Sequence, residues 1–232
     1  MATPPTVLYP LSLPALLHHV LTGQSATVPT TLIVCSGRDT FLQDLVGAYQ
    51  LQESHAREKI LQLAAPTLHN LFTARHVKIT FCASVQTLLA CLTARNRAVS
   101  EEAGASEREA SERIVLVNPL SLHAATSSFS AQGLSRTFAA AVETSLRLHA
   151  TLMVAECQGE WMQPTDEAEG EEEALEKEPR ASTEEDPWEQ EVSILNVSAK
   201  KFGGDRAWAG RTVKVKRIAA RWFRFRRLDN LE

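Results

Sequence analysis

Basic and aromatic residues alternate near the end of this chain, and a strongly acidic segment precedes them. Residues 199–232 carry a net charge of +8, whereas residues 165–191 carry a net charge of −11. A concentrated positive surface binds phosphate backbones or acidic partners. An aromatic ring among guanidinium groups, such as that of Trp222, suits single-stranded nucleic acid, because the ring stacks on a base while the cations contact phosphates. The candidate nucleic-acid-binding residues are Lys214, Lys216, Arg221, Trp222, Arg224 and Arg226.

Two other interpretations of these basic residues remain open. On an edge strand, charged side chains keep strands of separate molecules from pairing. Alternatively, the basic residues dock on a partner protein or on the chain's own acidic segment, where Glu171–Glu173 and Glu184–Asp186 screen them until a polyanion displaces the carboxylates. The screening hypothesis predicts that deleting residues 165–187 tightens binding to single-stranded DNA.

The turn after the predicted strand Thr31–Cys35 lies where many α/β proteins bind phosphate. A phosphate loop needs glycines for close backbone approach, a Lys for the phosphates and a Ser or Thr for Mg²⁺. This turn has one glycine and no Lys, and the carboxylate of Asp39 repels phosphate. Asp39 is better explained as an N-cap or first-turn carboxylate of a helix, with weak phosphate binding through Arg38 as the alternative. The degenerate phosphate loop comprises Ser36, Gly37, Arg38, Asp39 and Thr40.

The next buried strand, Ile114–Val117, is followed by Asn118 and Pro119. A nucleotide hydrolase places an acidic residue after such a strand to hold the Mg²⁺ shell. An amide is a weaker ligand than a carboxylate for this cation. The turn after Thr31–Cys35 and the residue after Ile114–Val117 both lack groups that nucleotide hydrolysis requires. We therefore expect no enzymatic activity and no cofactor.

Apolar segments of two periodicities predict the elements that position these residues. Strands are predicted at Thr31–Cys35, Val77–Cys82, Ile114–Val117 and Thr151–Cys157, and closing strands at Val192–Val197, Arg211–Ile218 and Arg221–Arg227. Helices are predicted at Phe41–Tyr49, Ile60–Phe72, Val85–Leu92 and Leu134–Leu146. This alternation predicts an α/β fold, with a mostly parallel central sheet flanked by helices and antiparallel C-terminal strands.

The proline-rich residues 1–30 are predicted to form an N-terminal extension, and residues 31–228 a single domain. Within that domain we expect a mobile insertion at 97–113 and a disordered acidic insertion at 162–189, because neither segment has enough apolar residues to fold. Trp161 and Trp188, expected to be exposed near the ends of the acidic segment, are expected to anchor its ends on the domain, with binding to a partner as the alternative.

Several other classes of function are not expected. The apolar runs are too short to span a bilayer, and the N-terminus lacks the pattern of a secretory signal. The four cysteines are widely spaced and predict reduced, buried thiols in an intracellular protein. The histidines show no metal-ligand spacing, and no C-x-x-C or G-x-S-x-G motif is present.

The order of the elements resembles the core of RecA-type recombinase paralogues. Ile33–Asp39 stands at the position of that family's phosphate loop, and Ile114–Pro119 at its second nucleotide motif. The family's next helix and strand resemble Leu134–Val142 and Thr151–Ala155, and its closing hairpin resembles Trp208–Ile218 with Trp222–Phe225. The resemblance covers residues 30–228 and implies a RecA-like domain without a functional phosphate loop, similar to subunits of Shu-type recombination mediator complexes.

The resemblance implies a non-catalytic accessory subunit in homologous recombination and DNA repair, located in the nucleus, with the cytoplasm as the alternative. Its expected partners are a recombinase-like or SWIM-type protein in a hetero-oligomer and single-stranded DNA, with no membrane. Two alternatives remain. One is an accessory ring subunit like those of the Elongator tRNA-modification complex, which would contact RNA. The other is a cryptic nucleotide-binding ATPase that uses Arg38 and Thr40.

Overall fold

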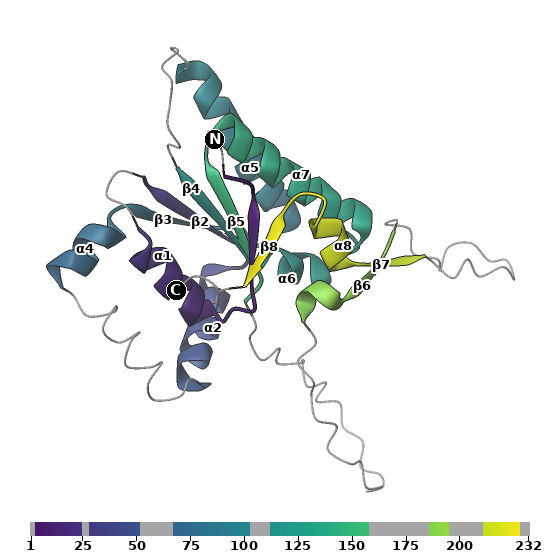
Figure 1. Ribbon diagram of the computed structural model, residues 1–232, viewed down its shortest axis with the longest axis horizontal. Helices are drawn as coiled ribbons and strands as arrows, with labels where there is room; N and C mark the ends of the chain where they lie inside the picture. The colour runs from purple at the N-terminus through teal and green to yellow at the C-terminus, as the bar shows by residue number, and fades with distance from the viewer. Residues whose placement is uncertain are drawn as a thin grey trace, which may run out of the picture.

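The computed structural model describes residues 3–24, 28–51, 67–102, 112–157, 186–194 and 211–227. Its centre is a six-stranded sheet in the order β3-β2-β4-β5-β1-β8, in which every neighbouring pair is parallel (Figure 1). The predicted α/β fold with a parallel sheet is confirmed. The strands are β1 (Thr6–Tyr9), β2 (Thr30–Val34), β3 (Val77–Phe81), β4 (Arg113–Val117), β5 (Thr151–Ala155) and β8 (Arg224–Arg227).

Helices cover both faces of the sheet, and each face has its own apolar core. Leu16 of α1 and Phe41 of α2 pack with Leu32 and Val117 on one face. Leu88 of α5 and Phe138 of α7 belong to the core on the other face. The helices are α1 (Leu13–Thr22), α2 (Arg38–Leu51), α4 (Leu68–Ala74), α5 (Val85–Glu102), α6 (Pro119–Ala124), α7 (Ala131–Arg147) and α8 (Val215–Ala219), with a 3₁₀ turn η1 (Pro187–Glu189).

The central strands are apolar on both faces because helices cover both. All five residues of β2 are buried, and so are the last four of β4. Apart from Thr30 and Thr31, these buried residues are apolar, and continuous apolar runs are typical of parallel strands. Helix α7 is instead amphipathic: its N-cap Ser130 accepts a hydrogen bond from Gly133 N, and Leu134, Phe138 and Ala141 form its buried stripe.

The predicted N-terminal extension is wrong, because its residues contribute a strand and a helix to the domain. Strand β1 lies between β5 and β8, with Val7 opposite both Val154 and Phe225. Ser12 then caps α1, and Pro14 occupies its first turn, where proline is tolerated. The prolines of this segment therefore mark a strand–turn–helix unit, with a cis Tyr9–Pro10 peptide at the turn.

The closing segments also differ from the prediction. Arg211–Ile218 was expected to be one strand, but β7 (Thr212–Lys214) pairs antiparallel with β6 (Glu191–Ser193), and α8 follows at once. Val215, Ile218 and Ala219 are buried at helical spacing, so burial of one helix face takes precedence over strand alternation. Antiparallel C-terminal strands are confirmed for β6 and β7, whereas β8 is parallel to β1.

The two predicted insertions are shorter than expected where the structure describes them. Helix α5 extends to Glu102 and β4 begins at Arg113, so only 103–111 of the first insertion lies outside the described residues. Most of the acidic insertion, with Trp161, also lies outside them. Its end forms η1, where Trp188 is only 1 % exposed, so this anchor is confirmed. No helix in the described ranges is long and apolar enough to cross a membrane.

Candidate functional site

Ligands of open α/β sheets bind beyond the carboxyl ends of the strands, where the following helices begin. The first strand-to-helix turn of this sheet follows β1, not β2 as the sequence suggested. It consists of Pro10, Leu11 and Ser12 and has no glycine. Ser12 Oγ accepts a hydrogen bond from Ala15 N at 3.4 Å, and Pro14 has no N–H. The start of α1 is therefore capped by its own chain and does not form a phosphate loop.

The turn after β2 holds the predicted degenerate phosphate loop. Asp39 lies in the first turn of α2, which confirms its interpretation as a first-turn carboxylate. Arg38, Asp39 and Thr40 are exposed, whereas Cys35 is buried. Ser36 Oγ donates to the neighbouring Gly37 carbonyl at 3.3 Å. The exposed carboxylate opposes phosphate binding at this helix start.

Asn118, the residue predicted to replace a metal-binding acid, ties the ends of two strands together. It has left-handed backbone angles, with φ at 57°, and precedes α6. Its Oδ1 accepts a hydrogen bond from Cys157 N at 2.8 Å, and its own N–H donates to the Ala155 carbonyl at 2.8 Å. Both hydrogen bonds connect β4 to the end of β5, so the amide has a structural role.

A buried carboxylate that the sequence analysis missed occupies the start of α6. Glu156 follows β5 and is 2 % exposed. Its Oε2 accepts a hydrogen bond from Leu120 N at 2.9 Å, and its Oε1 accepts from Ser121 N at 2.8 Å and from Ser121 Oγ. These N–H groups are the ones that would otherwise bind an anion at a helix start. The sequence signal for this site is an acidic residue at the end of the buried strand β5, whereas the expected position of the acid was the end of β4.

Burial is the main influence on the charge of this carboxyl. It raises the pKa of Glu156 to about 7, while the hydrogen bonds from Ser121 and Leu120 favour the ionised form and oppose the rise. Beside it is a cavity of about 170 Å³. The lining residues are Leu120, Ser121, Ala124, Glu156, Pro187 and Gln190. Glu156 can exchange a proton near neutral pH, but the donors that would stabilise an anionic intermediate are already bonded to it.

Two of the predicted nucleic-acid-binding cations are paired with a carboxylate of the same chain. Glu189 of η1 binds Lys214 at 3.0 Å and Lys216 at 2.8 Å. Hydrogen bonds from Lys216 and Lys214 lower the pKa of Glu189. Lys216 Nζ also lies 5.5 Å from the centre of the Tyr9 ring and 5.9 Å from that of Phe225. The two lysines thus connect η1, at the end of the acidic segment, to β7 and α8.

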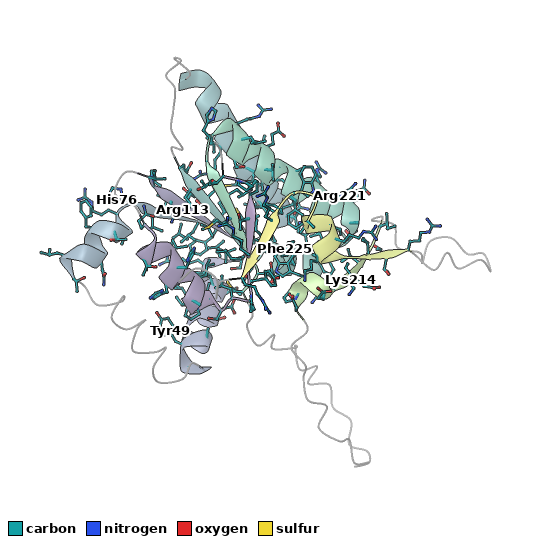
Figure 2. The ribbon with its side chains drawn as sticks, viewed as in Figure 1. Tyr49, His76, Arg113, Lys214, Arg221 and Phe225 are labelled. Carbon is teal, nitrogen blue, oxygen red and sulfur yellow. The ribbon has the colours of Figure 1, made fainter. Side chains whose placement is uncertain are left out.

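Trp222 was predicted to face outward with the arginines, and the structure places it differently. It lies in the turn after α8, where its ring is half-buried against the apolar core and its Nε1 is buried. The strand begins only at Arg224, so Trp222 does not share the alternation of β8. Stacking of this ring on a nucleic-acid base is therefore not supported. Arg221 is exposed in the same turn (Figure 2).

Arg224 and Arg226 occupy the position predicted for them. Both are exposed on β8, the edge strand, opposite Thr6 and Leu8 of β1. Phe225 points to the other face, where its ring contacts that of Trp188 at 5.4 Å between centroids. The alternation is confirmed from Arg224 to Arg226, where a half-buried Phe225 lies between two exposed arginines. The structure adds two exposed arginines to those predicted, Arg217 of α8 and Arg227 of β8.

No protein family and no curated protein matches this chain. Among solved structures, it is similar to one described as an ATPase domain, with 10 % sequence identity and a TM-score of 0.38. The match covers 66 % of this chain and 57 % of that chain, so it spans little more than half of the solved protein. The fold itself is defined by the strand order β3-β2-β4-β5-β1-β8.

Proposed function

We propose that this protein is a non-catalytic accessory subunit in homologous recombination and DNA repair, which binds single-stranded DNA and a recombinase-like or SWIM-type partner. The observation that carries the proposal is a contrast between two parts of the sheet. At the carboxyl ends of the strands, where a nucleotide would bind, side chains of the same chain bond the backbone donors of three helix starts, whereas the edge strand β8 exposes arginines.

The hydrogen-bonded helix starts support a role without ATP hydrolysis. Ser12 caps α1, Glu156 caps α6, and Ser84 Oγ accepts a hydrogen bond from Thr87 N at 3.1 Å at the start of α5. These hydrogen bonds satisfy backbone donors that a phosphate loop would leave free for the nucleotide. The start of α2 carries Asp39, whose charge opposes that of a phosphate.

The exposed arginines support contact with a nucleic-acid backbone. Arg224 and Arg226 lie on the same side of β8, two residues apart, and their side chains are exposed. Guanidinium groups at this spacing bind successive phosphates, and neutralising a phosphate releases counterions. Because Trp222 is packed against the core, we attribute binding to charge rather than to stacking.

The protein partner would bind the opposite edge of the sheet, where apolar side chains are exposed. Ile79 of the edge strand β3 is 49 % exposed, and Leu71 and Phe72 of α4, which precedes this strand, are 55 % and 52 % exposed. An edge strand can pair with a strand of another chain, and exposed apolar side chains favour such contacts. Replacing Ile79 with Lys should weaken capture of the recombinase-like partner without changing binding to DNA.

DNA binding is tested by fluorescence anisotropy with a labelled single-stranded oligonucleotide. The double variant Arg224→Gln/Arg226→Gln should bind more weakly, and the slope of log affinity against log salt should fall by roughly 1.4, about 0.7 for each phosphate contact. Arg75→Gln is the matched control, because Arg75 is exposed beyond α4, away from β8 (Figure 1).

Equal affinity and equal salt slope for the wild type and the double variant would contradict the proposal. The same assay with tRNA separates the proposal from the Elongator-like alternative. Stronger binding to tRNA than to single-stranded DNA, lost in the same double variant, would favour the RNA-binding function.

A further inference from the structure

Three cysteines meet beneath α5 at the carboxyl ends of β2 and β3. Val34 pairs with Phe81, and the next residues along these strands are Cys35 and Cys82. Cys82 N donates to the Val34 carbonyl at 2.8 Å, which continues the pairing. Both side chains belong to the core on the α5 side of the sheet, and Cys91 of α5 packs against that core.

Two of these thiols are in direct contact and differ in their access to solvent. The Cys82 and Cys91 side chains interact, and this interaction raises the pKa of Cys82 and lowers the pKa of Cys91. Cys82 is fully buried, whereas Cys91 is partly exposed. An external reagent can therefore reach Cys91, and the sulfur of Cys82 lies next to it.

Arg95, one turn further along α5, gives this pair an electropositive neighbour. Its Nη1 donates to Glu112 Oε1 at 2.9 Å and its Nη2 to Thr31 Oγ1 at 3.1 Å, which hold the guanidinium in place. The interaction with Cys82, followed by the charge of Arg95, lowers the pKa of Cys91. The thiolate is the nucleophilic form of cysteine, so Cys91 is the more reactive sulfur of the two.

The fourth cysteine, Cys157, differs from Cys91 in its burial and in the direction of its pKa shift. Cys157 follows β5 and is buried, and burial, together with the neighbouring Glu156, raises its pKa well above the usual range. Burial likewise raises the pKa of Cys35. The combination of a contacting sulfur, a fixed guanidinium and partial exposure is found, among the described cysteines, at Cys91.

We infer that Cys82 and Cys91 form a reversible disulfide in exchange with low-molecular-weight disulfides, such as glutathione disulfide. The Cys91 thiolate attacks one sulfur of the reagent, forms a mixed disulfide and releases one glutathione thiolate. The Cys82 sulfur then attacks the Cys91 sulfur and displaces the second glutathione, which takes up the Cys82 proton. Two protein thiols are oxidised and one glutathione disulfide is reduced to two glutathione thiols.

The test uses the full chain in buffers of increasing glutathione disulfide to glutathione ratio. Free thiols are blocked with N-ethylmaleimide, and the disulfides are assigned by mass spectrometry of peptides. The wild type should form the Cys82–Cys91 disulfide and lose it when reduced glutathione is added. Cys82→Ala should instead accumulate a glutathione adduct on Cys91, because no neighbouring sulfur displaces it. Cys157→Ser, the matched control, should behave like the wild type.

Three outcomes would overturn the inference. In the first, Cys91 pairs with Cys35 instead of Cys82. In the second, the glutathione adduct persists on wild-type Cys91 as it does in Cys82→Ala. In the third, Cys91 stays unmodified in the folded chain at ratios that modify it in urea.

A kinetic measurement on the wild type does not depend on any variant folding. The rate of Cys91 alkylation by iodoacetamide, followed against pH, should reach half its maximum below the pH typical of a free thiol. The charged and titratable groups around this sulfur are Cys35, Cys82 and Arg95, with Glu112 bound to Arg95. A midpoint at the pKa of an ordinary free thiol would mean that Cys91 is not the attacking sulfur.

Discussion

Replacing Glu156 with Gln should abolish a large pH dependence of this protein's stability. The carboxyl of Glu156 is fully buried, and burial raises its pKa from the ordinary 4.5 to about 7 in the folded chain. The corresponding difference in proton affinity is worth about 3 kcal/mol, at about 1.4 kcal/mol for each tenfold change. Gln has nearly the same shape as Glu and does not titrate, so it isolates this contribution.

The sign follows from which state holds the proton. Between the unfolded pKa and the folded pKa, the folded chain keeps a proton that the unfolded chain releases. Raising the pH therefore favours unfolding. The stability that Glu156 contributes is fully present below about pH 4.5 and is lost as the pH rises through about 7. The free energy of unfolding of the wild type should thus fall by about 3 kcal/mol across this range relative to that of Glu156→Gln.

The assay is urea unfolding, followed by circular dichroism at a series of pH values for both proteins. His19 and His123 have lowered pKa values, chiefly because of burial, and they contribute in the opposite direction between their folded pKa and the ordinary 6.5. Both histidines are present in each protein, so their effect largely cancels in the difference. Glu143→Gln serves as a control, because this carboxylate is 56 % exposed on α7 and is paired with Arg147.

Parallel stability profiles for the wild type and Glu156→Gln would refute this reasoning. So would a difference that grows in favour of the wild type as the pH rises. Either result would mean that the hydrogen bonds from Ser121 and Leu120, rather than desolvation, dominate the pKa of Glu156.

Three further predictions concern a tight packing contact, the basic residues and the nucleotide. Gly133→Ala should lower the free energy of unfolding by about 1–3 kcal/mol in urea titrations, because the added Cβ would lie 2.1 Å from the Ser128 carbonyl oxygen. Glu189→Gln should tighten binding to single-stranded DNA in anisotropy measurements, since it removes the carboxylate paired with Lys214 and Lys216; unchanged affinity would indicate that these lysines do not contact DNA. Mg-ATP should leave the melting temperature unchanged, and a concentration-dependent rise would support the cryptic ATPase.

The parallel sheet was predictable from the sequence because its inner strands must be apolar on both faces. The runs Thr31–Cys35 and Ile114–Val117 have no other favourable place than a core covered by helices on both sides. The sequence pattern did not predict strand β1, because this strand has only four residues and prolines lie on both sides of it. Its place in the sheet depends on pairing with β5 and β8, whose partner residues lie far away along the chain.

The short helix α8 illustrates a conflict between two periodicities. The segment from Val213 to Ile218 alternates apolar and basic residues up to Lys216, which favours a strand. Strand β6 offers only three residues for pairing, however, and the core beside α7 accommodates Val215 and Ile218 when they lie on one helix face. The chain turns helical where the partner strand ends.

The sequence alone was sufficient to predict the class of fold and the exposure of Arg224 and Arg226, because each depends on residue type and local spacing. Tertiary structure decided that the first helix start follows β1, that Glu189 pairs with both Lys214 and Lys216, and that Glu156 is desolvated at the start of α6. These last contacts join residues separated by about 25 to 36 positions. Their energies come from burial and charge pairing, which exist only once the strands have brought those residues together.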